Sequence, residues 1–225
     1  MPVAGLVAAV VCAAAVVGLV AAERARSARG RYVAKPIASA AFVAIPLVTG
    51  AVTGAGATEV ARWIALGLVL GAIGDVCLMF DHPRWFLAGL VAFLLGHIAY
   101  VVAFARLLPP AAWLDGPMAA MAIAAVAIAA IVLRWLWPHL GAMRGPVIAY
   151  VVVITTMLIG GLAIRVHDGG APGARTLLAA GAITFFLSDL AVARERFVVS
   201  DRWNRYVGLP VYYGAQVLMA WAIAA

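Results

Sequence analysis

The chain has 225 residues, of which 67% are apolar and only 11% are charged, and its formal net charge is +7. A soluble domain usually has about 25% charged residues, so this composition excludes an ordinary soluble enzyme or binding domain. The basic residues lie in short clusters between apolar runs, which is typical of a membrane protein and argues against a nucleic-acid partner.

Apolar runs of the length that a bilayer core requires follow one another along the whole sequence. We predict an all-α fold, a polytopic membrane bundle of about eight transmembrane helices that forms one domain over residues 1–225. The expected spans are 2–22, 33–54, 61–80, 85–105, 117–137, 146–165, 175–193 and 207–225. Basic residues follow the first run instead of preceding it, so we interpret this run as a helix and not as a signal peptide.

The distribution of basic residues predicts the orientation of the bundle. Twelve of the sixteen Arg and Lys residues fall in the odd-numbered loops, and four fall in the even-numbered loops. Because cytoplasmic loops carry the excess of basic residues, the odd-numbered loops are expected in the cytoplasm. The sequence therefore predicts a multi-pass protein of the inner (plasma) membrane with both termini outside the cytoplasm.

Two acidic residues are predicted to lie at membrane depth. Asp75 in the third span and Asp189 in the seventh each lie about 7–8 Å past the centre of the span, at 1.5 Å per residue. A carboxylate there costs about 2.5–3.5 kcal/mol on insertion scales, so both are candidate functional groups that can face each other inside the bundle. Alternatively, they are unrelated polar residues, each satisfied by a backbone carbonyl or a neighbouring Ser. The other acidic residues are interpreted as solvated charges in loops or at span ends: Glu23, Glu59, Asp81, Asp115, Asp168, Glu195 and Asp201.

Three spans place small residues and one ionisable group on a single helical face, at positions i, i+4, i+7 and i+8. These faces are Gly67, Gly71, Gly74 and Asp75; Gly89, Phe93, Gly96 and His97; and Gly181, Phe185, Ser188 and Asp189. Small residues let helices pack closely. Close packing explains the glycines, but it does not explain why an ionisable group recurs at the same place.

Other polar side chains are expected at a similar depth, where they would bind substrate or tune the two acids: Lys35, His97, Tyr100, Tyr150, Ser188, Tyr212, Tyr213 and Gln216. Lys35, the only Lys in the chain, either snorkels to the interface or binds a phosphate. A lone embedded His is more often a packing residue than a ligand. Cys12 and Cys77 show no metal-binding spacing, so we expect no metal site.

Two nearby carboxylates in a low dielectric do not both ionise easily, so one keeps its proton and the other stays charged. Such a pair fits three functions: hydrolysis of an acid-labile lipid bond, intramembrane proteolysis, and a proton relay in a transporter. A protease of the presenilin type would have Gly-x-Gly-Asp, but Ala72 stands at the first Gly, and no Pro-Ala-Leu occurs. A transporter would have broken helices in corresponding places, but Pro46 interrupts the second span and the other half shows no matching break.

Five motifs occur in order from the second span to the last: Lys35-Pro36, Gly74-Asp75, Gly89-x3-Phe93-x2-Gly96-His97-x2-Tyr100, Phe185-x2-Ser188-Asp189 and Tyr212-Tyr213-x-Ala215-Gln216. This set resembles the YhhN-like lysoplasmalogenase family. The resemblance implies a membrane hydrolase that cleaves the vinyl-ether bond of lysoplasmalogens to a fatty aldehyde and glycerophosphoethanolamine or glycerophosphocholine. It also implies that Asp75 and Asp189 are the catalytic acids. One departure from the family pattern is the more highly charged segment 193–197.

Vinyl ethers hydrolyse through protonation of the β-carbon and capture of the resulting oxocarbenium ion by water. The sequence therefore predicts one protonated Asp as general acid, and one ionised Asp that stabilises the cation and activates water. Either Asp could play either role. The expected partners are a lysophospholipid substrate and membrane lipids, with no metal or organic cofactor. The alternative is a proton-coupled membrane transporter or a lipid-binding membrane protein that uses the same buried aspartates.

Overall fold

The computed structural model describes residues 3–167, 170–199, 201 and 204–224. Asp168, which was expected in a loop, lies outside the described residues. Within these ranges the chain is helical with short connections, and no strand occurs. The predicted all-α fold is confirmed.

Eight long helices correspond one to one with the predicted spans in the described part of the chain. They are α1 (Val3–Arg24), α2 (Ala28–Val48), α3 (Glu59–Cys77), α4 (Pro83–Leu107), α5 (Pro117–Leu136), α6 (Arg144–Val166), α7 (Pro172–Ala193) and α8 (Leu209–Ala224). Helix α8 reaches spanning length together with the preceding π-helical turn η5 (Asn204–Gly208), and a second such turn, η4 (Arg194–Val198), extends α7. All eight are long and apolar enough to cross a bilayer, so this is a multi-pass membrane protein.

Helix α2 begins earlier than hydrophobicity predicts. We expected a span over 33–54, but the helix runs from Ala28 to Val48. Ser27 caps its first turn, because the side chain of Ser27 accepts a hydrogen bond from the Gly30 amide at 3.1 Å. The start of the helix is thus set by a capping residue and not by the first apolar residue. As a result Lys35 lies two turns inside the helix instead of at its start.

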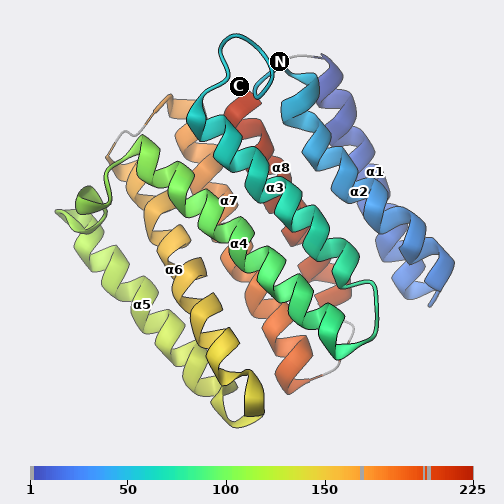
Figure 1. Cartoon of the computed structure of the whole chain (residues 1–225). Coiled ribbons are helices and arrows are strands. Elements are labelled where there is room, and N and C mark those ends of the chain that lie inside the picture. Colours follow the sequence, from blue (N-terminus) through green and yellow to red (C-terminus); the bar gives the residue numbers. More distant parts are fainter. Residues whose placement is uncertain (1–2, 168–169, 200, 202–203, 225) are drawn as a thin grey trace.

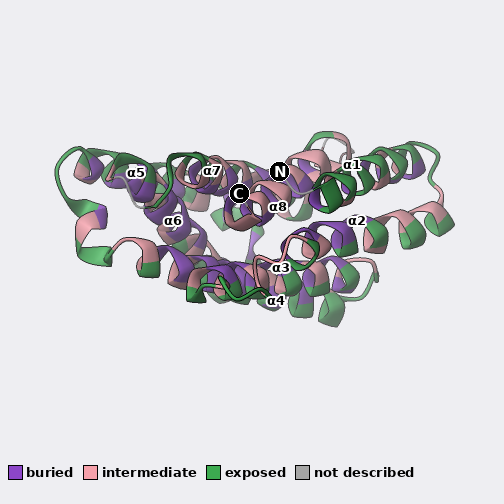
Figure 2. Ribbon diagram, turned by 90° about the horizontal axis from the view of Figure 1, so that it is seen from above, coloured by how far each residue is buried: buried purple, intermediate pink, exposed green. Residues whose placement is uncertain are grey.

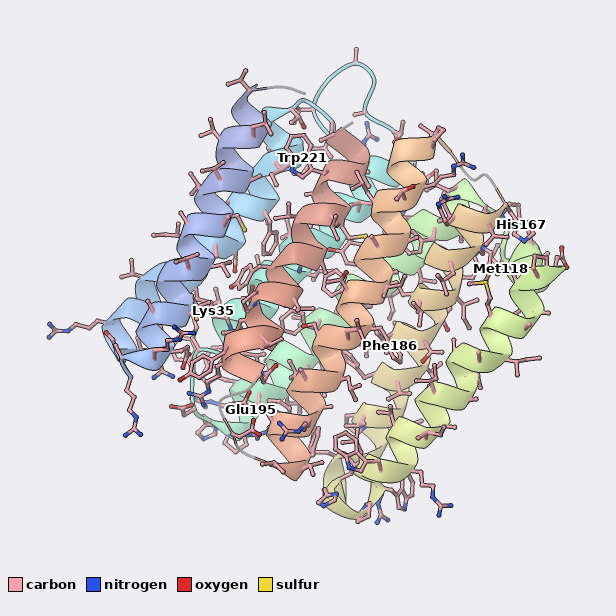
Figure 3. All side chains as sticks on the ribbon, turned by 180° about the vertical axis from the view of Figure 1, so that it is seen from behind. Lys35, Met118, His167, Phe186, Glu195 and Trp221 are labelled. Carbon is pink, nitrogen blue, oxygen red and sulfur yellow. The ribbon has the colours of Figure 1, made fainter. Side chains whose placement is uncertain are left out.

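Both termini lie at the same end of the bundle, as an even number of spans requires (Figure 1). The connections α1–α2, α3–α4, α5–α6 and α7–α8 lie at the opposite end (Figure 1). We call this opposite end the Lys35 end, because Lys35 and Glu195 lie toward it, while Trp221 lies toward the termini (Figure 3). The four odd-numbered loops therefore share one end, as the orientation prediction requires.

Viewed along the helices, α7, α8 and α1 lie on one side of the bundle and α3 and α4 on the other, with buried residues between them (Figure 2). The outer faces carry large apolar side chains that are well exposed, such as Val17, Ile123 and Ile131. In a soluble protein such a surface would be unfavourable. Around a membrane bundle, it is the surface that lipid chains cover.

Side chains from α4 and α8 pack against the glycine face of α3. A Cβ atom at Gly74 would lie 2.7 Å from Cε2 of Phe93, and one at Gly67 would collide with the ring of Tyr100. At Gly71 an added methyl group would collide with the amide of Gln216. The small-residue face predicted from the sequence therefore brings aromatic and polar side chains close to the backbone of α3.

Candidate functional site

A cavity of about 320 Å³ lies toward the Lys35 end, and every one of the eight helices contributes to its wall. Its apolar part includes Ala129, Val132, Ile154, Phe186 and Leu190. Its polar part contains both predicted acids together with charged side chains of the connections at the Lys35 end. The cavity therefore has an apolar compartment and a charged compartment, as a site for a single-chain amphiphile requires.

Asp75 of α3 is buried, with 2% of its surface exposed, and all of its partners are donors. The ammonium group of Lys35 lies 3.3 Å from Oδ1 of Asp75. Two hydroxyl groups donate to Oδ2, that of Ser39 at 2.7 Å and that of Tyr212 at 3.0 Å. A buried carboxylate with a cation and two hydrogen-bond donors is a satisfied anion.

A second layer of hydrogen bonds holds the donors of Asp75 in place. Gln216 Nε2 donates to the hydroxyl group of Tyr212 at 2.9 Å, and the hydroxyl group of Tyr100 donates to Gln216 Oε1 at 2.8 Å. The hydroxyl group of Tyr213 lies 3.3 Å from Ser39 Oγ. Because Tyr100, Tyr212, Tyr213 and Gln216 are all buried, this network fixes the geometry around the carboxylate without help from bulk water.

Asp189 of α7 has a different environment. The hydroxyl group of Tyr150 donates to its Oδ2 atom at 2.9 Å, and Nε2 of His97 lies 3.6 Å from the same oxygen. The other ring nitrogen of His97, Nδ1, lies 2.7 Å from the carbonyl oxygen of Phe93. A carbonyl oxygen only accepts, so Nδ1 carries a proton, while Nε2 faces Asp189 from beyond hydrogen-bond distance.

The structure brings the ten predicted site residues together in two shells. Six of them line the cavity: Lys35, Asp75, Tyr150, Ser188, Asp189 and Tyr212. The other four are behind the wall in the described part of the chain. His97, Tyr213 and Gln216 contact lining residues directly, whereas Tyr100 contacts His97 and Gln216. Both acids line one cavity, and their hydrogen bonds go to different side chains.

Ser39, the closest partner of Asp75, was missed by sequence reasoning. It follows Lys35 by four residues, so the two side chains share one face of α2. That spacing was the available signal. It was hidden because Lys35 was expected at the start of the span and Ser39 looked like an ordinary small residue among alanines.

The interpretation of Glu23 and Glu195 as solvated loop charges is wrong. Their side chains are only 10% and 16% exposed, and both line the cavity. Each forms an ion pair with Arg205, at 3.1 Å from Glu23 and at 3.0 Å from Glu195. Sequence position alone suggests solvent for a charge at a helix end, but the packing of α1 against η5 covers these two. Asp115, in contrast, is exposed as expected.

Comparison with known proteins identifies the family. The model of the YhhN family matches residues 30–223, which is most of the chain. The chain belongs to the YhhN family. The match covers α2 to α8 and therefore contains all ten predicted site residues.

Several curated YhhN relatives are named lysoplasmalogenase. A "Lysoplasmalogenase" of Mycobacterium bovis is 33% identical over 164 residues, which is 70% of this chain and 59% of that protein. "Lysoplasmalogenase TMEM86A" of Homo sapiens is 32% identical over 163 residues, 70% of this chain and 63% of its own length. "Lysoplasmalogenase TMEM86B" of Homo sapiens is 34% identical over 153 residues, covering 68% and 59%. The matched region thus spans about 60% of the length of these relatives. No solved structure matches the chain.

Proposed function

We propose that this chain is a membrane-embedded hydrolase that cleaves the vinyl-ether bond of lysoplasmalogens to a fatty aldehyde and a glycerophospho-base. The observation that carries the proposal is that two buried carboxylates in contrasting environments, Asp75 and Asp189, line one cavity whose remaining wall is partly apolar and partly charged. The names of the YhhN relatives support the same activity.

Asp75 is the acid that stays ionised in this mechanism. The Lys35 ammonium group and the hydroxyl groups of Ser39 and Tyr212 all stabilise a negative charge on its carboxylate. Removing the proton from a buried acid is favourable only where such partners are present. Asp75 therefore stabilises the oxocarbenium ion and accepts a proton from the attacking water.

Asp189 is the acid that delivers the proton. Nε2 of His97 lies 3.6 Å from its Oδ2 atom, and because the Phe93 carbonyl holds Nδ1 as a donor, Nε2 is the unprotonated nitrogen that faces the carboxyl group. Tyr150 donates to Asp189 and orients its carboxyl group. His97 does not line the cavity, so it acts through Asp189 as a positioning and proton-sharing residue.

The proposed steps return both acids to their starting state. Asp189 transfers its proton to the β-carbon of the vinyl ether, which leaves an oxocarbenium ion. Water adds to this ion while Asp75 takes a proton from it, and a hemiacetal results. Asp75 then returns that proton to the ether oxygen as the carbon–oxygen bond breaks, while the hemiacetal hydroxyl proton goes to Asp189. The products are one aldehyde and one alcohol. The charge distribution resembles that in glycosidases, whose transition state is also oxocarbenium-like.

The apolar compartment of the cavity is the proposed site of the hydrocarbon chain. Ala129 and Val132 of α5, with Val147 and Ile154 of α6, form much of its wall. The vinyl-ether bond would then lie between this compartment and the charged one, beside the two acids. If the Lys35 end faces the cytoplasm, as the basic loops predict, the lipid enters laterally from the inner leaflet.

The test is aldehyde release from a lysoplasmalogen, measured by mass spectrometry, with purified wild type, Asp75→Asn and Asp189→Asn in detergent. The exposed loop acid Asp115 provides the matched control, Asp115→Asn. We expect wild type and the control to release aldehyde, while each buried-acid variant loses at least about 100-fold in rate, the lower range for general acid–base catalysis. An inert wild type, or full activity in either buried-acid variant that remains folded, contradicts the proposal.

A further inference from the structure

The charged compartment of the cavity contains a cluster that the proposed chemistry does not use. Its members come from α1, α2 and the segment between α7 and α8, and all of them line the cavity: Glu23, Arg31, Glu195, Asn204 and Arg205. Arg205 bridges the two acids, with Nη1 at 3.1 Å from Glu23 Oε2 and Nε at 3.0 Å from Glu195 Oε1. Positions 182 residues apart in sequence thus meet in one wall.

The two arginines of this cluster have guanidinium N–H groups that can still donate hydrogen bonds to a ligand. Arg205 uses Nε and Nη1 for the two carboxylates, and among the described residues its Nη2 group has no acceptor. Among the described residues, the guanidinium group of Arg31 makes only a long contact, with Nη1 at 3.8 Å from Glu23 Oε1. The Arg31 and Arg205 side chains are 37% and 42% exposed, whereas those of Glu23 and Glu195 are 10% and 16% exposed. The acids are largely covered, and the guanidinium groups remain accessible.

The charges of the cluster suit a zwitterion. Guanidinium groups bind phosphate through paired, charge-assisted hydrogen bonds. The carboxylates of Glu23 and Glu195 can accept hydrogen bonds from an ammonium group. The two carboxylates and two guanidinium groups give the cluster a net charge of zero. A headgroup with one phosphate and one ammonium is also neutral, so the cluster remains neutral when this headgroup binds. An anionic headgroup would leave the carboxylates facing more negative charge.

The carboxylates of this cluster favour a primary ammonium over a trimethylammonium. A primary ammonium has three N–H donors for carboxylate oxygens, whereas a quaternary ammonium has none and is recognised by the faces of aromatic rings. Phe86 is one of the aromatic side chains in the cavity wall, but the guanidinium group of Arg196 already covers its ring at 4.1 Å from the centroid. The wall therefore offers acceptors for N–H groups, while this ring face is occupied.

The cluster lies at a suitable distance from the reaction site. Arg31 precedes Lys35 by four residues on α2, which corresponds to about 6 Å along the helix axis. Lys35 in turn contacts Asp75. A phosphate on Arg31 would thus lie about one helical turn from the Lys35–Asp75 pair, a separation that the three-carbon glycerol backbone and its phosphoester bond can span.

We propose that Glu23, Arg31, Glu195 and Arg205 form a headgroup subsite that selects phosphoethanolamine lysolipids over phosphocholine lysolipids. Arg31 and Arg205 hold the phosphate, and Glu23 and Glu195 accept hydrogen bonds from the ammonium group. This inference rests on the proposed function, because it takes the cavity to be the lysolipid site. It also revises the expectation that Lys35 holds the phosphate, since Lys35 is already paired with Asp75.

The experiment measures binding separately from hydrolysis. Saturated 1-O-alkyl lysophospholipids, which lack a vinyl-ether bond, are titrated into the purified full chain by calorimetry in detergent. Ethanolamine and choline headgroups are compared with 1-O-alkylglycerol, which has no headgroup. We expect the ethanolamine lipid to bind wild type about tenfold more tightly than the choline lipid, the size of one charge-assisted hydrogen bond.

The variants separate the two halves of the subsite. Glu195→Gln is expected to bring the ethanolamine-to-choline ratio close to one. Arg31→Gln is expected to weaken both phospholipids about tenfold and to leave 1-O-alkylglycerol unchanged. The controls are Arg29→Gln, an exposed position on the same helix, and Glu59→Gln, an exposed acid near the other end of the bundle, and neither should change any of the three affinities.

Equal affinity of wild type for the two phospholipids overturns the subsite. So does an equal loss for all three ligands in Arg31→Gln and Glu195→Gln, because that pattern indicates a structural role. Aldehyde release from vinyl-ether substrates is then measured on the same samples. If the protein selects the ethanolamine headgroup but releases no aldehyde, the proposed function is wrong and the subsite is supported. If it releases aldehyde but does not select a headgroup, the proposed function is supported and the subsite is wrong.

Discussion

Nε2 of His97 lies 3.6 Å from Oδ2 of Asp189, and the imidazole ring is held in that orientation from its other side. This relationship predicts that His97→Asn lowers kcat while changing KM little, because the side chain acts on Asp189 behind the cavity wall. We expect a loss of about 100-fold, within the usual range for proton transfer. Steady-state kinetics on a folded variant provide the measurement. A higher KM with unchanged kcat would indicate that His97 contacts the lipid instead.

The Lys35–Asp75 pair predicts a rescue of stability without a rescue of activity. Lys35→Met leaves a buried carboxylate without its cation and is expected to destabilise the fold by about 3–5 kcal/mol. The double variant Lys35→Met/Asp75→Asn removes both charges and should recover most of that loss, while remaining inactive. Denaturation in detergent and aldehyde release are measured in parallel. If the double variant is no more stable than Lys35→Met, the ion pair is not what stabilises this site.

Two glycines provide a matched test of the close packing against α3. Gly71→Ala places a methyl group against the amide of Gln216 and within 3.3 Å of the hydroxyl group of Tyr212, so the donor to Asp75 must shift. We expect lower activity together with lower thermal stability. Gly214→Ala, on α8, has no atom within 4 Å of the new methyl group and should be neutral or slightly stabilising, since Ala favours helix by about 0.5–1 kcal/mol. Loss of activity in Gly214→Ala, or a silent Gly71→Ala, contradicts this packing argument.

The wall of the apolar compartment predicts chain-length selection. Ala129 lines the cavity, and its neighbour Ala130 is exposed on the outer face of α5. Ala129→Leu should exclude about two methylene groups of the longest chains, which at about 0.8 kcal/mol each corresponds to about a tenfold rise in KM. Short-chain substrates should be unaffected, and Ala130→Leu should behave as wild type. KM values for a series of chain lengths test this, and a rise that is equal for all lengths would count against the assignment.

The number and order of the helices could be predicted from the sequence because bilayer thickness fixes the length of each apolar run. Asp75 and Asp189 were expected at one depth, and the structure places both in the wall of one cavity. Rotation about the helix axis was not predictable, because it depends on which neighbours pack against which face. For this reason Tyr212 could be expected near the acids, but its specific bond to Asp75 could not.

The burial of charged residues at helix ends also could not be predicted from the sequence. Glu23 and Glu195 follow apolar runs, as solvated charges do in many membrane proteins. Their partner Arg205 comes from a π-helical turn that brings α8 back against α1, and nothing in the local sequence specifies that contact. Sequence patterns determine what each helix can bury, whereas long-range packing determines which charges become covered.

The division of the cavity into an apolar and a charged compartment also bears on what happens after the bond breaks. The proposed hydrolysis would separate an amphiphile into an oil-soluble aldehyde and a water-soluble phosphodiester. The aldehyde would then lie among Val132, Val147 and Ile154, and the phosphodiester beside Arg31 and Arg205. Under the proposed function, each product would partition into the phase that dissolves it, and this partitioning between two solvents would oppose recombination.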